Sequence, residues 1–272
     1  MTVRHIPIER EIAANRRLLL SFVARELRAR YAGSAMGIFW AVIHPLIILM
    51  LYIAVFSTLT RGATVSIGGH AANYAVFLCP ALLAWNWMNE SLLGACQSIT
   101  GNASLIRRVA FPVGILPAAS LVAGLLPFLV AMVLFLIFAA IVGAFHPVSL
   151  VLLPPLVLLQ VALMTGPAYL LASLNVAVRD TAQILMAGLQ VLFWSSPIVY
   201  EQKTLEAALP WTRWWFDLNP VAHLMTAYRD VIVAHRLPSA GRLLYLLIIA
   251  LILHDAGRRI FQHARRRFAD DV

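Results

Sequence analysis

The sequence predicts an all-α integral membrane protein with six transmembrane helices, and three observations lead to this fold class. Of its 272 residues, 61% are hydrophobic and 12% are charged, whereas about 25% are charged in a typical soluble domain. Apolar runs long enough to cross a bilayer core of about 30 Å recur along the chain. Lys and Arg gather at the chain ends and between these runs, which indicates membrane topology and not a nucleic-acid-binding face.

The first element, residues 8–31, alternates arginine with apolar side chains at a helical period, which predicts an amphipathic helix in the inner membrane interface. A soluble helix packed on a partner protein is the alternative interpretation. The first span, 36–59, follows directly and carries no charged residue, so the arginines before it predict a cytoplasmic N-terminus. Residues 61–70 are expected to form a polar turn before the second span, 71–99.

Two further spans, 113–142 and 148–174, are expected in a long segment that lacks acidic and basic side chains. A fifth span, 184–199, and a last span, 239–257, complete the six. Residues 201–242, which lie between the fifth and last spans, are too polar to cross a membrane and too rich in tryptophan for a plain loop. We therefore expect short re-entrant helices there, in the outer interface.

Six spans place both termini on one side of the membrane, and the positive charges test that topology. With the termini inside, 15 of the 21 Lys and Arg residues lie on the inner side and six on the outer side. Because Lys and Arg accumulate in cytoplasmic loops, the sequence predicts a multi-pass protein with both ends in the cytoplasm.

The motifs that the sequence lacks restrict its function. The one lysine, Lys203, follows Gln202, so the chain has no Gly-Lys-Ser/Thr phosphate loop and cannot be a P-loop ATPase by itself. It also has no His-Glu-x-x-His zinc pair and no Gly-x-Ser-x-Gly elbow. We predict no catalytic residue, metal site or cofactor in this chain. Glu90 lies at the expected membrane depth, where acidic residues are usually functional, but a position near an interface is equally open.

Several short motifs, taken in chain order, resemble one family. They are Arg25-Glu-Leu-Arg-x-Arg-Tyr-x-Gly-Ser-x-x-Gly-x-x-Trp with Pro45, Asn102-x-x-Leu-Ile with Phe111-Pro112, Arg179-Asp180, Ser196-Pro197-Ile198, Asn219-Pro220 and Arg229. Together they are similar to the permease subunits of ABC-2 type polysaccharide exporters over nearly the whole chain. The resemblance implies one transmembrane domain over residues 1–272.

The resemblance also implies a function. The chain would be the permease of an ATP-driven transporter that exports a lipid-linked polysaccharide, such as O-antigen, capsular polysaccharide or teichoic acid, across the bacterial inner membrane. Its partners would be a second copy of the chain, two ATPase subunits that bind ATP and Mg²⁺, membrane lipids and the polymer. Periplasmic export partners are left open, and no nucleic acid is expected. A permease for a drug or small lipid and a membrane-embedded lipid-linked sugar transferase are the alternatives.

On this basis, residues are assigned to three sites. Those implied to couple to the ATPase are Arg25, Glu26, Arg28, Asn102, Arg107, Arg108, Phe111, Arg179 and Asp180, although positive-inside anchoring also explains the arginines. Sugar rings stack on aromatic faces, so candidates for the substrate pathway are Tyr31, Trp40, Tyr52, Phe56, Trp85, Trp87, Glu90, Phe193 and Trp194, with lipid-facing packing as the alternative. An outer gate is expected at Trp211, Trp214, Trp215 and Asn219, with an aromatic anchor in the outer leaflet as the alternative.

Overall fold

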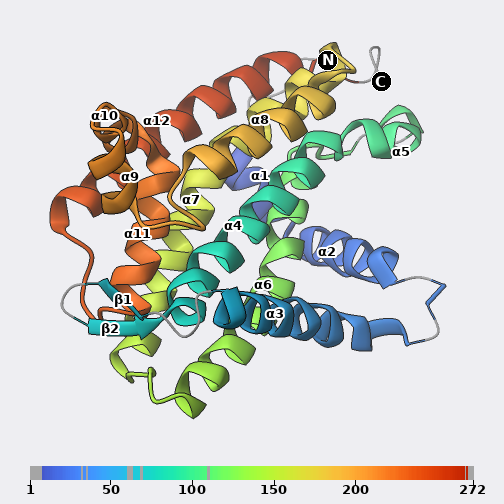
Figure 1. The fold of residues 1–272 in the computed structure, drawn as a ribbon. Helices are drawn as coiled ribbons and strands as arrows, with labels where there is room; N and C mark the ends of the chain where they lie inside the picture. Colours follow the sequence, from blue (N-terminus) through green and yellow to red (C-terminus); the bar gives the residue numbers. More distant parts are fainter. Residues whose placement is uncertain are drawn as a thin grey trace.

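The computed structural model describes residues 8–31, 33–34, 36–59, 64–67, 70–108, 111–266 and 268. Long helices run side by side through the molecule (Figure 1). The helices that correspond to the six expected spans are α3 (Trp40–Leu59), α4 (Tyr74–Gln97), α6 (Ile115–Ile141), α7 (Val148–Ala177), α8 (Thr181–Ser195) and α12 (Ala240–Ala264). The largely helical architecture is therefore as predicted, with differences in several element boundaries.

Among the described residues, three helices are long and apolar enough to cross a membrane, namely α6, α7 and α12. The apolar stretch Val42–Val55 within α3 and the whole of α8 are shorter. Helix α12 extends to Ala264, beyond the predicted end at residue 257, because its last turns leave the apolar run and carry ion-paired arginines instead.

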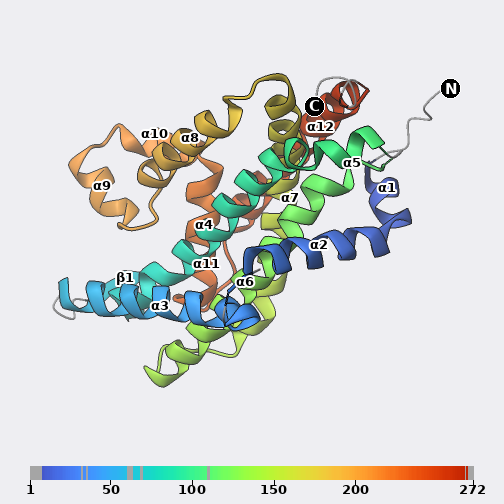
Figure 2. The same ribbon diagram turned by 90° about the vertical axis from the view of Figure 1, so that its right-hand side faces the viewer.

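The N-terminal segment is two helices, α1 (Ile8–Ala14) and α2 (Arg16–Tyr31), where the sequence predicted one. The break falls at Asn15, whose side-chain amide donates to the carbonyl of Glu11 at 2.8 Å. Such local side-chain bonds compete with helix continuation. Helix α2 packs on α6 beside α3 (Figure 2).

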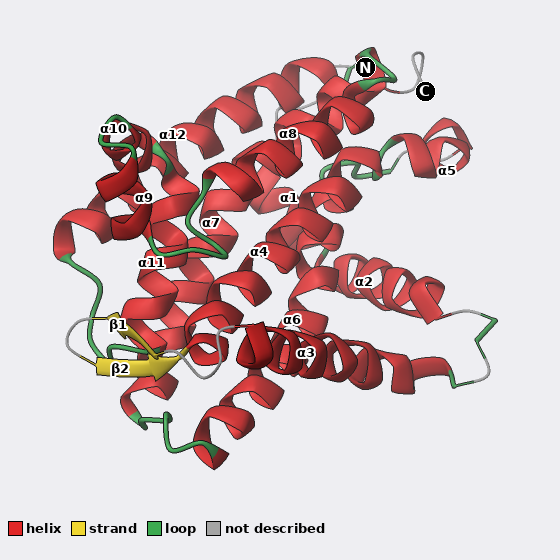
Figure 3. Cartoon of the chain, in the orientation of Figure 1, coloured by secondary structure: helices red, strands yellow, loops and turns green. Residues whose placement is uncertain are grey.

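A β-hairpin precedes α4 and corrects the expected turn at 61–70 and helix start at 71. Strands β1 (Thr64–Ile67) and β2 (His70–Asn73) pair in antiparallel register, with Thr64 opposite Asn73 (Figure 3). The signal was present in the β-branched residues of β1 and the two glycines that follow them in the sequence. Asn73 then begins α4, because its side chain accepts a hydrogen bond from the Ala75 N–H at 2.9 Å.

The backbones of α7 and α12 approach each other closely at two glycines. A Cβ added at Gly166 would lie 2.1 Å from the Leu253 carbonyl oxygen, and one at Gly257 would lie 2.1 Å from the Gly166 oxygen. Small residues allow membrane helices to pack at this distance, where van der Waals contact replaces the hydrophobic effect. The two glycines therefore fix how α7 and α12 pack.

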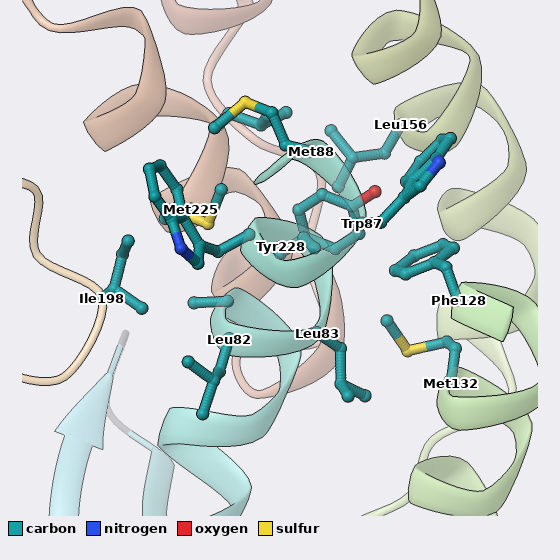
Figure 4. Close-up of a cluster of buried hydrophobic side chains, with 14 of the residues drawn as sticks. Leu82, Leu83, Trp87, Met88, Phe128, Met132, Leu156, Ile198, Met225 and Tyr228 are labelled. Atoms are coloured by element: carbon teal, nitrogen blue, oxygen red, sulfur yellow. The ribbon is translucent and has the colours of Figure 1, made fainter. Parts of the chain in front are cut away.

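The centre of the protomer is an apolar cluster shared by α4, α6, α7 and α11 (Pro220–Ile232) (Figure 4). Trp87 stacks on Phe128 with ring centroids 4.6 Å apart. One buried amide crosses this cluster, since Gln160 donates to the Ala84 carbonyl at 2.9 Å and accepts from the Tyr228 hydroxyl at 2.7 Å. Polar groups in a dry interior need such partners, so this network fixes the position of α11 against α4 and α7.

Candidate coupling and pathway surfaces

A short helical segment links α4 to α6 and contains the first set of predicted coupling residues. It consists of η2 (Thr100–Asn102) and α5 (Ala103–Arg108), and it lies at the same end of the molecule as the end of α12 (Figures 1 and 2). Arg107 and Arg108 are exposed in the last turn of α5. Phe111 follows and packs against Phe22 of α2, with ring centroids 5.2 Å apart.

The second set, Arg179 and Asp180, is exposed at the turn between α7 and α8. A hydrogen bond joins the two sets, because the Asn175 amide of α7 donates to the Thr100 hydroxyl of η2 at 3.1 Å. Asn175 is buried, and sequence reasoning missed it because nothing in its local pattern separates it from other small polar residues in a span. The two coupling segments, predicted separately, are thus connected directly.

Helix α2 brings a third set of predicted residues to the same place. Arg25 donates to the side-chain oxygen of Asn102, and its guanidinium lies 4.3 Å from the centre of the Phe22 ring. Arg25, Glu26 and Asn102 line a cavity of about 320 Å³ between α2, the end of α4 and the start of α6. Arg28 does not line this cavity and donates to the Ala24 carbonyl of its own helix.

Two carboxylates on this face pair with Arg30. Glu26 lies 3.9 Å from Arg30 and accepts from the Ser120 hydroxyl at 3.3 Å. Burial raises the pKa of Glu26, and the nearby Arg30 and the Ser120 hydrogen bond oppose that rise. Glu90 lies 3.0 Å from Arg30. Glu90 is therefore beside α2, and its role in a pathway stays a prediction.

The predicted pathway aromatics fall into a buried and an exposed group. Trp85 and Trp87 are 5% and 3% exposed within the core of the protomer. Phe193 contacts Trp85 on one side and Trp194 on the other, with ring centroids 5.6 and 5.1 Å apart. Trp194 is 59% exposed. Trp40 and Tyr52 are partly buried, and the side chains of Tyr31 and Phe56 lie outside the described part of the structure.

Helix α8 presents a polar stripe that sequence reasoning missed. Gln183, Ala187, Gln190 and Trp194 recur at spacings of four, three and four residues and are all exposed. This spacing puts them on one face of the helix. Amide groups are costly in hydrocarbon unless they find hydrogen-bond partners, so this face suits an aqueous space better than lipid. Two glutamines at helical spacing in an otherwise apolar span were the available signal.

The segment between α8 and α12 forms three short helices, α9 (Gln202–Ala208), α10 (Thr212–Leu218) and α11. Trp211, Trp214 and Trp215 are 60%, 55% and 37% exposed around α10. The Trp215 indole donates to the Ser195 carbonyl at 2.9 Å. Asn219, grouped with the tryptophans from sequence, is instead buried and caps α11, with its side chain accepting from the Val221 N–H at 2.9 Å.

Two charged residues of the segment 201–242, which the sequence placed in the outer interface, are buried in α11. Arg229 is 4% exposed, lies 3.8 Å from the centre of the Phe77 ring and donates to three backbone carbonyls, of Phe77, Pro197 and Ile198. Asp230 is ion-paired with Arg236, at 2.8 Å, and with Arg242 at the start of α12. These bonds join α11 to α4, to the end of α8 and to α12.

No three His, Cys, Asp or Glu side chains in the described ranges gather in a group that could hold a metal ion. The contacts described above for α2, η2–α5 and α11 are ion pairs, hydrogen bonds and aromatic packing. Such contacts suit the docking and movement of helices.

Comparison with known proteins identifies the family of this chain. Residues 17–233 match the ABC-2 type transporter family, and the chain belongs to this family. It is 31% identical to the O-antigen export system permease protein RfbA of Myxococcus xanthus, over 98% of this chain and all of that protein. Two proteins of the same name from Klebsiella pneumoniae are 28% and 26% identical, over 93% of this chain and 94% of each relative.

These findings confirm the family resemblance drawn from the short motifs. Family membership makes this chain a membrane component of a transporter that associates with an ABC ATPase. The matched region includes α2, both coupling segments and α8 through α11.

Proposed function

We propose that this chain is the permease subunit of an ATP-driven exporter of a lipid-linked polysaccharide, and that it works as a homodimer with two ATPase subunits in the bacterial inner membrane. The observation that carries the proposal is the full-length similarity to three O-antigen export permeases. The connected coupling segments at one end of the molecule support it. ATP and Mg²⁺ would bind to the partner subunits, since this chain lacks a phosphate loop.

In the proposed topology α3, α4, α6, α7, α8 and α12 are the six spans and both termini are cytoplasmic. Helices α1 and α2 lie in the inner interface, where the arginines of α2 meet anionic lipid headgroups. Helices α9 to α11 occupy the outer interface as re-entrant elements. The distribution of Lys and Arg supports this orientation.

The ATPase subunits would dock on η2–α5 and on the turn at Arg179 and Asp180. Both regions expose charged side chains, and Arg25 of α2 is hydrogen-bonded to Asn102 at their edge. A displacement of η2–α5 would therefore reach α2 through Arg25 and α7 through Asn175.

The polysaccharide would pass along the exposed face of α8. Gln183 and Gln190 supply amide donors and acceptors for sugar hydroxyls, and Trp194 supplies an aromatic face for a sugar ring. A second copy of the chain facing this stripe would enclose a conduit.

The tryptophans around α10 would close the outer end of that conduit between transport cycles, because apolar constrictions resist wetting. Replacement of Trp211, Trp214 and Trp215 with alanine should then increase ion leak through reconstituted vesicles without ATP. Lower stability without leak would indicate an aromatic anchor in the outer leaflet.

The proposed function is tested by deletion of the gene in its own cells. We expect polysaccharide to disappear from the cell surface and accumulate inside, and expression of the chain from a plasmid should restore it. The Arg179→Ala and Asp180→Ala variants should reach the membrane and export less. Unchanged surface polysaccharide in the deletion strain would contradict the proposal, and a gain in drug sensitivity alone would favour a drug permease.

A further inference from the structure

The residue that precedes α6 is anchored through both its N–H and its carbonyl. Gly114, at the N-cap position of the helix and without a capping side chain, donates its N–H to a carboxylate oxygen of Glu11 at 3.4 Å. Its carbonyl accepts from the Tyr169 hydroxyl of α7 at 2.8 Å. Peptide N–H groups at a helix start lack helical partners, and a carboxylate there is also favoured by the helix dipole. Glu11 thus acts as a cap for α6 from another part of the chain.

Glu11 is itself held by the other end of the chain. Its second oxygen accepts from the Arg265 guanidinium at 3.0 Å, and the two side chains are 10% and 12% exposed. Arg265 caps the end of α12. A buried ion pair with its remaining hydrogen bonds made is tolerated, whereas removal of one partner leaves a costly buried charge. The N-terminal helix and the C-terminal helix therefore meet at the start of α6.

Apolar packing joins the same elements to the coupling segment. Ile99 directly precedes η2, and Ile106 lies in α5. Both are buried in one cluster with Ile8 of α1 and with Phe261 and Phe268 of the C-terminal region. Ile106 is buried in this cluster, whereas the two arginines that follow it in α5 are exposed. Because Glu11 and Arg265 are almost fully buried, they offer little surface to an ATPase subunit.

We propose that Glu11, held by Arg265, is a positioning residue that fixes the start of α6 while the partner ATPase displaces η2–α5. With this point fixed, the displacement passes into α6 and α7, which Tyr169 connects at Gly114. With this point released, the start of α6 shifts together with η2–α5 and does not pass the movement on, so ATP is hydrolysed with less export. The inference rests on the proposed docking of the ATPase on η2–α5.

The test compares variants of the full chain, co-expressed with the ATPase in cells that lack the native gene. The measured quantities are permease abundance in the membrane, recovered ATPase subunit, ATP hydrolysis and surface polysaccharide. Glu11→Ala should lower polysaccharide exported per ATP hydrolysed several-fold, with the ATPase recovered at the wild-type ratio. Glu11→Gln keeps one acceptor oxygen but removes the charge that pairs with Arg265, so its export per ATP should lie between those of Glu11→Ala and the wild type.

Two further variants keep the proposal falsifiable if Glu11→Ala folds poorly. Tyr169→Phe removes the second tether of Gly114 with little change in shape and should reduce export per ATP in the same direction. Glu9→Ala is the matched control on α1. The Glu9 side chain is 51% exposed and pairs with His254, so this variant removes a carboxylate from the same helix without touching Gly114. It should export as the wild type does.

Equal export per ATP by the wild-type, Glu11→Ala and Tyr169→Phe chains would overturn the proposal. So would a loss of export that only follows permease abundance, because that result describes a stabilising residue. Failure of the wild-type chain to restore surface polysaccharide would instead refute the proposed function, so the two failures are distinguishable.

Discussion

Helices α7 and α12 are packed to backbone contact, whereas α3 and α8 are barely covered by the rest of the chain. At Gly166 and Gly257 two main chains touch. In α8 only Thr181, Ala182 and Leu189 are buried, and in α3 Leu49 is the one buried residue among the described side chains. Without a hydrophobic force between helices in lipid, close packing and hydrogen bonds decide association. The difference therefore separates a closely packed body from two helices whose surfaces are largely uncovered in this chain.

The largest effect is expected at the α7–α12 contact. Gly166→Ala places a methyl group 2.1 Å from the Leu253 carbonyl oxygen, and the backbones must separate. Overpacking of this kind costs about 1 to 3 kcal/mol or more. Gly188→Ala in α8 is the matched control, since its added Cβ meets nothing within 4 Å and alanine is favoured over glycine in a helix by about 0.5 to 1 kcal/mol. The unfolding temperature in detergent should fall for Gly166→Ala and rise for Gly188→Ala. A change in the same direction for both variants would contradict the difference in packing between the two regions.

Arg229→Met should destabilise the closely packed body to a similar extent. Three buried carbonyls lose their donor, one unsatisfied buried group costs about 1 to 3 kcal/mol, and relaxation should recover part of the sum, so that the net loss is of the same order as at Gly166. Arg213→Met tests the same substitution at an exposed position of α10, where changes stay within about 0.5 kcal/mol. Membrane yield and unfolding temperature measure both. Similar values for the two variants would mean that α11 is not anchored through Arg229.

On α8, loss of polarity should affect transport and not stability. The double variant Gln183→Leu with Gln190→Leu removes two exposed amides, so unfolding should change by less than about 0.5 kcal/mol. Surface polysaccharide should fall several-fold, because sugar hydroxyls lose their partners. Met186→Leu, an exposed apolar change on the same helix, should export normally. Full export by the double variant would show that this stripe does not face the polymer.

The smallest effect concerns pH at the interfacial helices. Burial raises the pKa of Glu26, so the folded chain binds this proton more tightly than the unfolded chain, and stability falls as pH rises through this range. At Glu9 burial acts in the same sense but is outweighed by hydrogen bonds from its own backbone and His254, so its pKa is lowered and its stabilisation is lost as pH falls. Glu26→Gln should thus remove a decrease in unfolding temperature with rising pH, and Glu9→Gln should remove an increase. If both substitutions changed the pH dependence of the unfolding temperature in the same sense, the opposite pKa shifts of Glu26 and Glu9 would be contradicted.

Local pattern determined much of the protein. The alternation of arginine and apolar residues in α2, the uncharged runs of α6 and α7 and the tryptophan-rich segment before α12 were all readable from side-chain period and polarity. The family was recognisable because the motifs around Arg25, Asn102 and Arg179 occur in its order, and the coupling role of these residues stays a prediction. These features depend on residues that are close together in the chain, so they can be predicted from the sequence alone.

The tertiary structure decided what depends on residues far apart in the chain. Nothing in the local sequence distinguishes Gln160, Arg229 or Asn175. Their roles appear only at contacts between helices, where Gln160 and Arg229 bond to α4 and Asn175 bonds to η2. Glu11 and Arg265 are 254 residues apart, yet they form one ion pair at the start of α6. The sequence alone therefore determined the family and the main helices, because apolar period and motif order are local. Only the fold decided which buried polar groups are paired, because a membrane interior requires partners that local pattern does not specify.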